Sequence, residues 1–184
     1  MTKNAVLFLL VFISISCQKE PTKKEHPVEK PAAENTKIEK KESNQKIIES
    51  ENAKKWLIET VETYFKKDYP KMSVITTNAY EEYKTEATNV DLDTEIAMTQ
   101  TEFENKWKDK YDTKYAGIGY GFLISGQDWG KIEVTQCNLL SQNKGIYTFQ
   151  TIISDTEFKT DYTRDITIIK SGSFFLIDDV KEYD

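Results

Sequence analysis

The fold is decided by residues 131–180, KIEVTQCNLLSQNKGIYTFQTIISDTEFKTDYTRDITIIKSGSFFLIDDV. Apolar and polar residues alternate in four runs, which predict strands over residues 131–140, 146–154, 158–170 and 174–180. The connections are so short that only antiparallel pairing is possible, because a parallel crossover needs about a dozen residues or more. Residues 122–124 form a further short apolar run. We therefore expect an antiparallel sheet of four to five strands.

Alternation also assigns the side chains of these strands to the two faces of the sheet. One face should carry two rows of mainly apolar side chains, one row from each central strand. These rows are Tyr147, Phe149, Thr151 and Ile153, and Tyr162, Arg164, Ile166 and Ile168.

The residues before the strands show helical periodicity and should cover that face. A first helix is predicted from Ser50, as its N-cap, to Asp68. A second should follow Pro70, and a third should begin at Thr99 or Thr101, each of which has a Glu three residues later. Helices followed by strands indicate an α+β domain with about three N-terminal helices packed on a curved antiparallel sheet. The predicted buried residues of the second helix are Met72, Ile75, Ala79, Tyr80 and Tyr83.

The N-terminus has the features of a secretory signal over residues 1–16. Lys3 precedes nine apolar residues, Ala5 to Ile13, a run well short of the ~20 residues that span a bilayer. Small residues before Cys17 resemble the lipobox of bacterial lipoproteins, although Ser14 stands where Leu is usual. The resemblance implies that Cys17 is lipidated and becomes the mature N-terminus.

Residues 17–50 are predicted to be a disordered tether between this lipidated Cys and a single domain, residues 51–184. Residues 18–50 hold eight Lys, seven Glu, three of the four Pro and no aromatic residue, so they cannot build a core. The stretch Cys17–Glu20 resembles the export signal of surface lipoproteins in Bacteroidota, and a generic charged linker is the alternative. We expect the outer membrane or the cell surface rather than the inner membrane.

Composition excludes several functions. A mean hydropathy of −0.62 is too polar for a multispanning membrane protein. Residues 51–184 hold 16 of the 25 basic and 24 of the 31 acidic side chains, a net charge of −8 that argues against a nucleic-acid partner. The single His, His26, lies in the tether, so the domain has no imidazole for catalysis or metal binding. We predict no cofactor and no metal.

Two motifs carry a family resemblance. Gln127-Asp128-Trp129 precedes the main strands, and Ser173-Phe-Phe-Leu-Ile-Asp-Asp-Val180 closes the sheet. With the order of elements, they resemble the nuclear transport factor two-like superfamily, a cystatin-like cone, and within it an uncharacterised family of secreted bacterial domains. The resemblance implies a curved sheet that wraps a long first helix and leaves a cavity. It implies no functional residues, because the narrower family has no established activity.

The polar residues of these motifs favour structural roles. Asp178 and Asp179 are adjacent on a strand, so their side chains should point to opposite faces. Asp128, beside Trp129, should accept a backbone N–H in its turn. Cys137, in a strand, should be a buried and inert thiol. Residues 117–121, GIGYG, suggest a flexible segment leading into the sheet rather than a phosphate loop, since no Lys follows them.

Aromatic residues and one Arg remain as candidates for a ligand site. Arg164 is the only Arg of the chain and is expected in an ion pair on the sheet surface, or as a ligand clamp. A cavity in the cone would be lined by Tyr64, Tyr80, Trp107, Tyr111 and Arg164. We expect a lipid-anchored extracytoplasmic domain that binds a small molecule or a protein without catalysis. An immunity-type or protein-interaction lipoprotein, and a cavity enzyme of the cyclase or isomerase type, stay open as alternatives.

Overall fold

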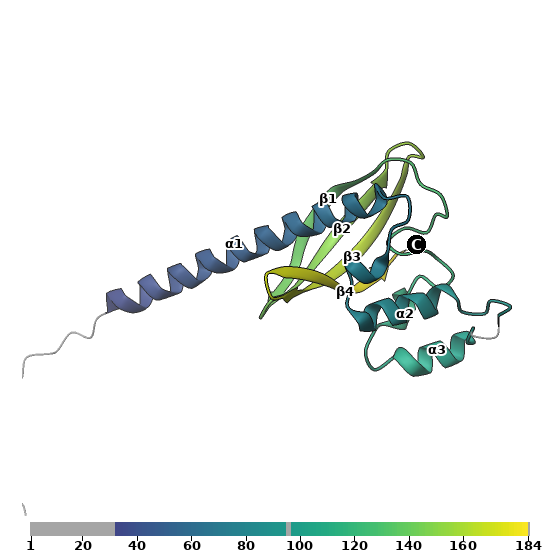
Figure 1. Cartoon of the computed structure of the whole chain (residues 1–184). Coiled ribbons are helices and arrows are strands. Elements are labelled where there is room, and N and C mark those ends of the chain that lie inside the picture. Colours follow the sequence, from purple (N-terminus) through teal and green to yellow (C-terminus); the bar gives the residue numbers. More distant parts are fainter. Residues whose placement is uncertain (1–31, 95–96, 184) are drawn as a thin grey trace, which may run out of the picture.

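The computed structural model describes residues 32–94 and 97–183, with side chains from residue 43 onward. They form three α-helices and a four-stranded antiparallel sheet, which confirms the α+β class (Figure 1). The predicted signal and Cys17 lie outside the described residues. Within those residues, no helix is long and apolar enough to cross a membrane.

Helix α1 (Ala32–Phe65) is much longer than predicted. Its buried stripe, Ala53, Leu57, Val61 and Phe65, recurs every four residues as expected. Ser50, however, is not the N-cap, because the helix continues through it and its Oγ donates to the carbonyl of Ile47 at 2.9 Å. Residues 32–50 of the predicted tether are therefore helical rather than disordered.

Helix α2 (Asn78–Thr88) begins later than the apolar pattern after Pro70 suggests. The chain first makes a 3-10 turn, Met72–Val74, and then a short parallel bridge from Thr76 to Ile177 of the last strand. Thr77 caps α2 by accepting the N–H of Tyr80 at 3.2 Å. Pairing with the sheet edge thus delays the helix by several residues.

Helix α3 (Gln100–Trp107) confirms one of the two predicted starts. Thr99 is its N-cap, and a capping box joins Thr99 to Glu102 in both directions. A second 3-10 turn, Thr113–Tyr115, follows before the chain enters the glycine-rich stretch.

The sheet is a meander with strand order β1-β2-β3-β4, in which all neighbours are antiparallel. The strands are β1 (Ile132–Asn143), β2 (Ile146–Asp155), β3 (Thr160–Ser171) and β4 (Phe174–Glu182). Residues 122–124 are not a strand, since Leu123 has a positive φ of 71°. The predicted fifth strand is therefore wrong.

The inner face of the sheet packs against α1, while α2 and α3 lie beyond β4 (Figure 1). The predicted row of β2, from Tyr147 to Ile153, is buried on this face, with no side chain more than 1% exposed. Cys137 of β1 is also buried, and burial raises the pKa of its thiol to about 11, as expected for an unreactive Cys.

A bulge in β4 changes the positions of the two adjacent acids. The register with β3 passes from Ile177 to Asp179 and skips Asp178. Ile177 and Val180 are consequently both buried although they are three residues apart. Burial raises the pKa of the Tyr111 phenol, and the charges of Asp178 and Asp179 both raise it further. The prediction that the two carboxylates face opposite sides is wrong.

The turn before β1 also differs from the prediction. Asp128 is exposed, and the backbone N–H of Gly130 is instead accepted by Asp155 at 2.7 Å. Asp155 also accepts the N–H groups of Glu157 and Phe158, and these bonds lower its pKa. Asp155 therefore has the structural role that the sequence predicts for Asp128.

Candidate functional site

An apolar hollow lies where α1 ends, against residues 119–129. Its volume is about 600 Å³. We call it the aromatic hollow because five rings contribute to its lining. The polar side chains Asp68, Lys71, Thr88 and Gln127 complete its rim. The five rings are Tyr64, Phe65, Tyr69, Phe122 and Trp129.

Four of these rings hold one another in place. Tyr64 meets Phe65 and Phe122 edge to face, with ring centres 5.1 and 5.3 Å apart, and Phe65 meets Trp129 at 5.3 Å. The indole N–H of Trp129 donates to the carbonyl of Phe65 at 3.1 Å, which fixes the ring against the last turn of α1. These walls are preorganised by packing.

The fifth ring, Tyr69, is 89% exposed. It follows the C-terminal end of α1, beside the lining residues Asp68 and Pro70. A large aromatic side chain left in water at the mouth of an aromatic hollow is suited to cover a bound molecule.

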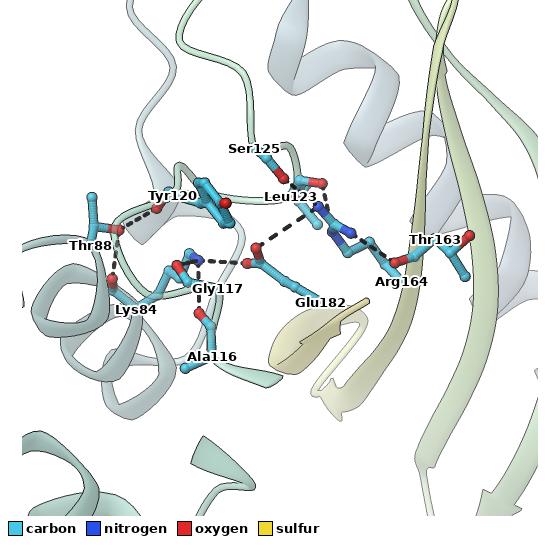
Figure 2. Close-up of polar contacts among 10 residues, drawn as sticks. All are labelled: Lys84, Thr88, Ala116, Gly117, Tyr120, Leu123, Ser125, Thr163, Arg164 and Glu182. Atoms are coloured by element: carbon cyan, nitrogen blue, oxygen red, sulfur yellow. Dashed lines mark hydrogen bonds and ion pairs between the residues drawn. The ribbon is translucent and has the colours of Figure 1, made fainter. Parts of the chain in front are cut away.

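The opposite wall is the glycine-rich segment, residues 116–125, and a buried cluster of charges fixes it (Figure 2). Lys84 of α2 and Glu182 of β4 form an ion pair at 2.6 Å, and both side chains are 1% exposed. Arg164 of β3, 0% exposed, approaches the other oxygen of Glu182 at 3.9 Å. We call these three residues the buried triad.

Both cations of the triad bind the backbone of the glycine-rich segment. Lys84 donates to the carbonyls of Ala116 and Gly117 at 2.9 and 3.1 Å. Gly117 has a φ of 60° and no room for a Cβ, which would collide with the carboxylate of Glu182. The segment is therefore held by buried charge, which contradicts the predicted flexible lead-in to the sheet.

Arg164 fixes the end of the same segment. Its Nε donates to the carbonyl of Leu123 at 3.0 Å, and its terminal nitrogens donate to Thr163 and Ser125. Leu123 has the left-handed backbone that disfavours branched L-residues, and Arg164 stabilises this conformation. The expected place of Arg164 on the sheet surface is wrong, because its guanidinium lies in the core.

A second cavity, of about 510 Å³, lies on the other side of residues 117–121. We call it the polar cavity. Gly117, Ile118 and Tyr120 line it, whereas Gly119 and Gly121 line the aromatic hollow. The glycine-rich segment is thus a thin wall between two cavities. The other lining residues of the polar cavity are Gln100, Glu104, Thr113, Lys114 and Glu182.

The predicted cavity residues fall into three places. Tyr64 lines the aromatic hollow, and Arg164 belongs to the buried triad. Tyr80, Trp107 and Tyr111 pack with Tyr83 and Phe103 in an aromatic cluster between α2 and α3, with Tyr83 and Tyr111 ring centres 4.3 Å apart. Tyr80, Trp107 and Tyr111 therefore line neither the aromatic hollow nor the polar cavity.

One carboxyl beside this cluster has a strongly perturbed pKa. Burial raises the pKa of Asp179 to about 6, and Asp178 contributes to the increase. Asp179 is not part of the lining of the polar cavity or of the aromatic hollow. Among the described residues, no group of three or more His, Cys, Asp or Glu could hold a metal ion.

Sequence reasoning missed Lys84 and Glu182, the two residues that form the shortest contact of the triad. A signal for Lys84 was present, because it lies four residues after Tyr80 and three before Ala87, on the buried face of α2. A charged residue at such a position needs a buried partner. Nothing local marks Glu182 as that partner.

The chain matches no known protein family, and it has no significant similarity to a curated protein or to a solved structure.

Proposed function

We propose that the protein is a lipid-anchored binding domain of the bacterial cell envelope, which holds a small molecule in the aromatic hollow without transforming it. The observation that carries this proposal is the hollow itself. Its volume of about 600 Å³ suits a small ligand, since ligand pockets commonly measure roughly 300–1,000 Å³. Packed rings form its walls, and a few polar side chains form its rim.

The rigidity of the wall supports binding. Each contact of the buried triad with the glycine-rich segment fixes backbone that would otherwise lose entropy when a ligand binds. The chemistry of the lining favours a molecule with one apolar face, which would lie on the rings, and with polar groups that reach Asp68, Lys71 or Gln127.

The proposed location rests on the lipobox-like sequence before Cys17. Lipidation there would hold the domain on the outer membrane or at the cell surface. The proposed family is the nuclear transport factor two-like superfamily. It is supported by a long first helix packed on the inner face of a curved sheet (Figure 1), and by the aromatic hollow at the end of that helix.

A cavity enzyme is the second candidate, and the raised pKa of Asp179 is the observation in its favour. A general acid or base must reach the reacting molecule, however, and Asp179 lines neither of the two cavities described above. Binding is therefore the better proposal. A protein-interaction lipoprotein would instead use the exposed apolar side chains of the surface.

A thermal-shift screen of small molecules on residues 18–184 tests the binding proposal. A ligand present at a hundred times its dissociation constant stabilises the fold by about 2.7 kcal/mol, which is measurable as a higher unfolding temperature. The stabilisation should be lost in Tyr69→Ala, which opens the mouth of the hollow. It should persist in Phe158→Ala, a matched control whose ring is 60% exposed in the β2–β3 turn.

Two outcomes would reject parts of the proposal. Conversion of a stabilising ligand into a product would reject the non-catalytic function. Unchanged membrane fractionation of Cys17→Ala would reject the lipid anchor and leave the binding site untouched.

A further inference from the structure

One end of the domain combines exposed apolar side chains with a local excess of positive charge. It consists of the ends of two hairpins, residues 139–146 and 169–176, and of the turn of α1 that contacts both. We call it the hairpin end. The three parts are tied together, since Gln142 donates to the carbonyl of Lys46 at 3.2 Å, Lys170 meets Glu49 at 3.8 Å, and the N–H of Lys170 donates to Gly145 at 2.8 Å.

The hairpin end leaves several large apolar side chains in contact with water. Six large apolar side chains there are each at least 44% exposed. The register also places Ile146 opposite Ile169, and Ile169 opposite Leu176, which makes a continuous apolar row across three strands. The six exposed residues are Ile47, Ile48, Leu139, Leu140, Ile146 and Phe174.

The charge of this end is opposite to that of the domain. Residues 134–154 and 166–177, which form most of the two hairpins, contain two Lys and neither Asp nor Glu. With Lys46 of α1, the end carries three Lys, and Glu49 beside them is already paired with Lys170. Residues 51–184 as a whole carry a net charge of −8. A basic and apolar end on an acidic domain, with its Glu49 paired to Lys170, indicates an anionic partner surface.

We propose that the hairpin end lies on the surface of an anionic phospholipid bilayer, the same membrane that holds the lipid anchor. The inference rests on the proposed lipidation of Cys17. Exposed side chains such as Phe174 and Leu140 enter the interface between headgroups and acyl chains. Lys46 and Lys144 meet lipid phosphates, and Lys170 neutralises Glu49 beside them.

The length of the chain permits this contact. Helix α1 projects beyond the sheet (Figure 1). From Lys46, whose carbonyl still contacts Gln142, back to Ala32 the helix measures about 21 Å at 1.5 Å per residue. The fifteen residues from Cys17 to Ala32 can span at most about 50 Å. The anchor can therefore reach the bilayer even when the helix lies along it and the hairpin end touches the surface.

The test uses the lipid-anchored full chain, purified from membranes and reconstituted into vesicles of phosphatidylglycerol and brominated phosphatidylcholine. Bromine quenches a tryptophan only when the ring enters the lipid. One variant carries Phe174→Trp at the hairpin end. The matched control carries Phe158→Trp, which is similarly exposed but lies in the β2–β3 turn at the opposite end of the meander. Emission of the parent protein is subtracted from both.

The added tryptophan at position 174 should be quenched at least about twofold more than the one at position 158. Quenching at position 174 should fall when Lys144 and Lys170 are replaced by Glu, and when the salt concentration rises from 0.1 to 1 M, because salt screens the headgroup charge. Equal quenching at the two positions would overturn the inference while the protein still floats with the vesicles.

Two further outcomes would also overturn it. Chains that do not float with vesicles would refute the lipid anchor and the docking together. The alternative partner is a second copy of the chain. In that case the protein in detergent would be a dimer that Phe174→Glu dissociates, and the tryptophan added at position 174 would be shielded from acrylamide.

Discussion

Replacing Lys84 with Met tests how much the buried triad contributes to the free energy of unfolding. The substitution keeps most of the volume of the side chain and removes its charge and its donors. Glu182 then stays 1% exposed and loses its 2.6 Å ion-pair partner, with Arg164 at 3.9 Å, and the carbonyls of Ala116 and Gly117 lose a donor. Breaking a buried ion pair by removing one partner costs about 3–5 kcal/mol.

Lys106→Met is the matched control. Lys106 pairs with Glu86 at 2.6 Å, the same distance as Lys84 and Glu182, but these two side chains are 41% and 22% exposed. An ion pair in water contributes about 0–1 kcal/mol. Both substitutions therefore remove a Lys–Glu contact of the same length. They differ in burial and in the second partners, because Lys84 also donates to two backbone carbonyls and Lys106 also pairs with Glu82 at 2.8 Å.

Urea denaturation followed by circular dichroism measures both free energies of unfolding. With a slope of about 2 kcal/mol per M, Lys84→Met should lower the midpoint by roughly 2 M, and Lys106→Met by less than about 0.5 M. Equal, small shifts of the two midpoints would contradict the buried triad, because they would show that Lys84 is hydrated in solution and does not hold the glycine-rich segment.

Three further substitutions test other parts of the account. Ionisation of Asp179 opposes folding, because its pKa rises from 3.8 to about 6 in the folded protein. In urea titrations, Asp179→Asn should therefore stabilise the protein by roughly 1–3 kcal/mol at pH 7.5, and this gain should largely vanish by pH 4. Asp128→Asn, at an exposed position, should show neither effect. Gly117→Ala should lower the free energy of unfolding by several kcal/mol, because the added Cβ would collide with Glu182. Gly119→Ala, with open space around it, should cost only about 1 kcal/mol for its positive φ. Similar urea midpoints for the two variants would contradict the close approach of Glu182 to Gly117. Cys137, in a chain carrying Cys17→Ala, should react with a disulfide reagent at pH 8 only after urea unfolding, and rapid reaction of the native protein would contradict its burial.

The strands could be predicted from sequence because their signals are local. Alternation along each run and short turns, two to four residues long in the structure, define β1 to β4 without knowledge of distant contacts. The capping box at Thr99 is equally local, and it predicts the start of α3 correctly.

The N-terminal boundary of α1 could not be predicted from composition. A stretch rich in Lys and Glu is typical of disordered tethers, but the same residues have high helix propensity. The apolar stripe begins only at Ala53, so periodicity placed the helix start at Ser50, eighteen residues after its actual start at Ala32.

The candidate site depends on contacts between residues far apart in the chain. Arg164 reaches Leu123, and Lys84 reaches Glu182 across 98 positions, so no local pattern reveals the triad. The bulge at Asp178 likewise follows from the pairing of β4 with β3, and it overrides the alternation from which opposite faces were predicted. Aromatic density, in contrast, is a local signal, and Tyr64, which it predicts as a lining residue, borders the aromatic hollow.

A crystal structure of residues 18–184 with the most strongly stabilising small molecule tests the binding proposal most directly. We expect density for the molecule in the aromatic hollow, between Tyr69 and Trp129, with residues 116–125 in the position they have without a ligand. Density in the polar cavity, or a glycine-rich segment that is rearranged around the ligand, would contradict the proposal that the preformed aromatic hollow is the binding site.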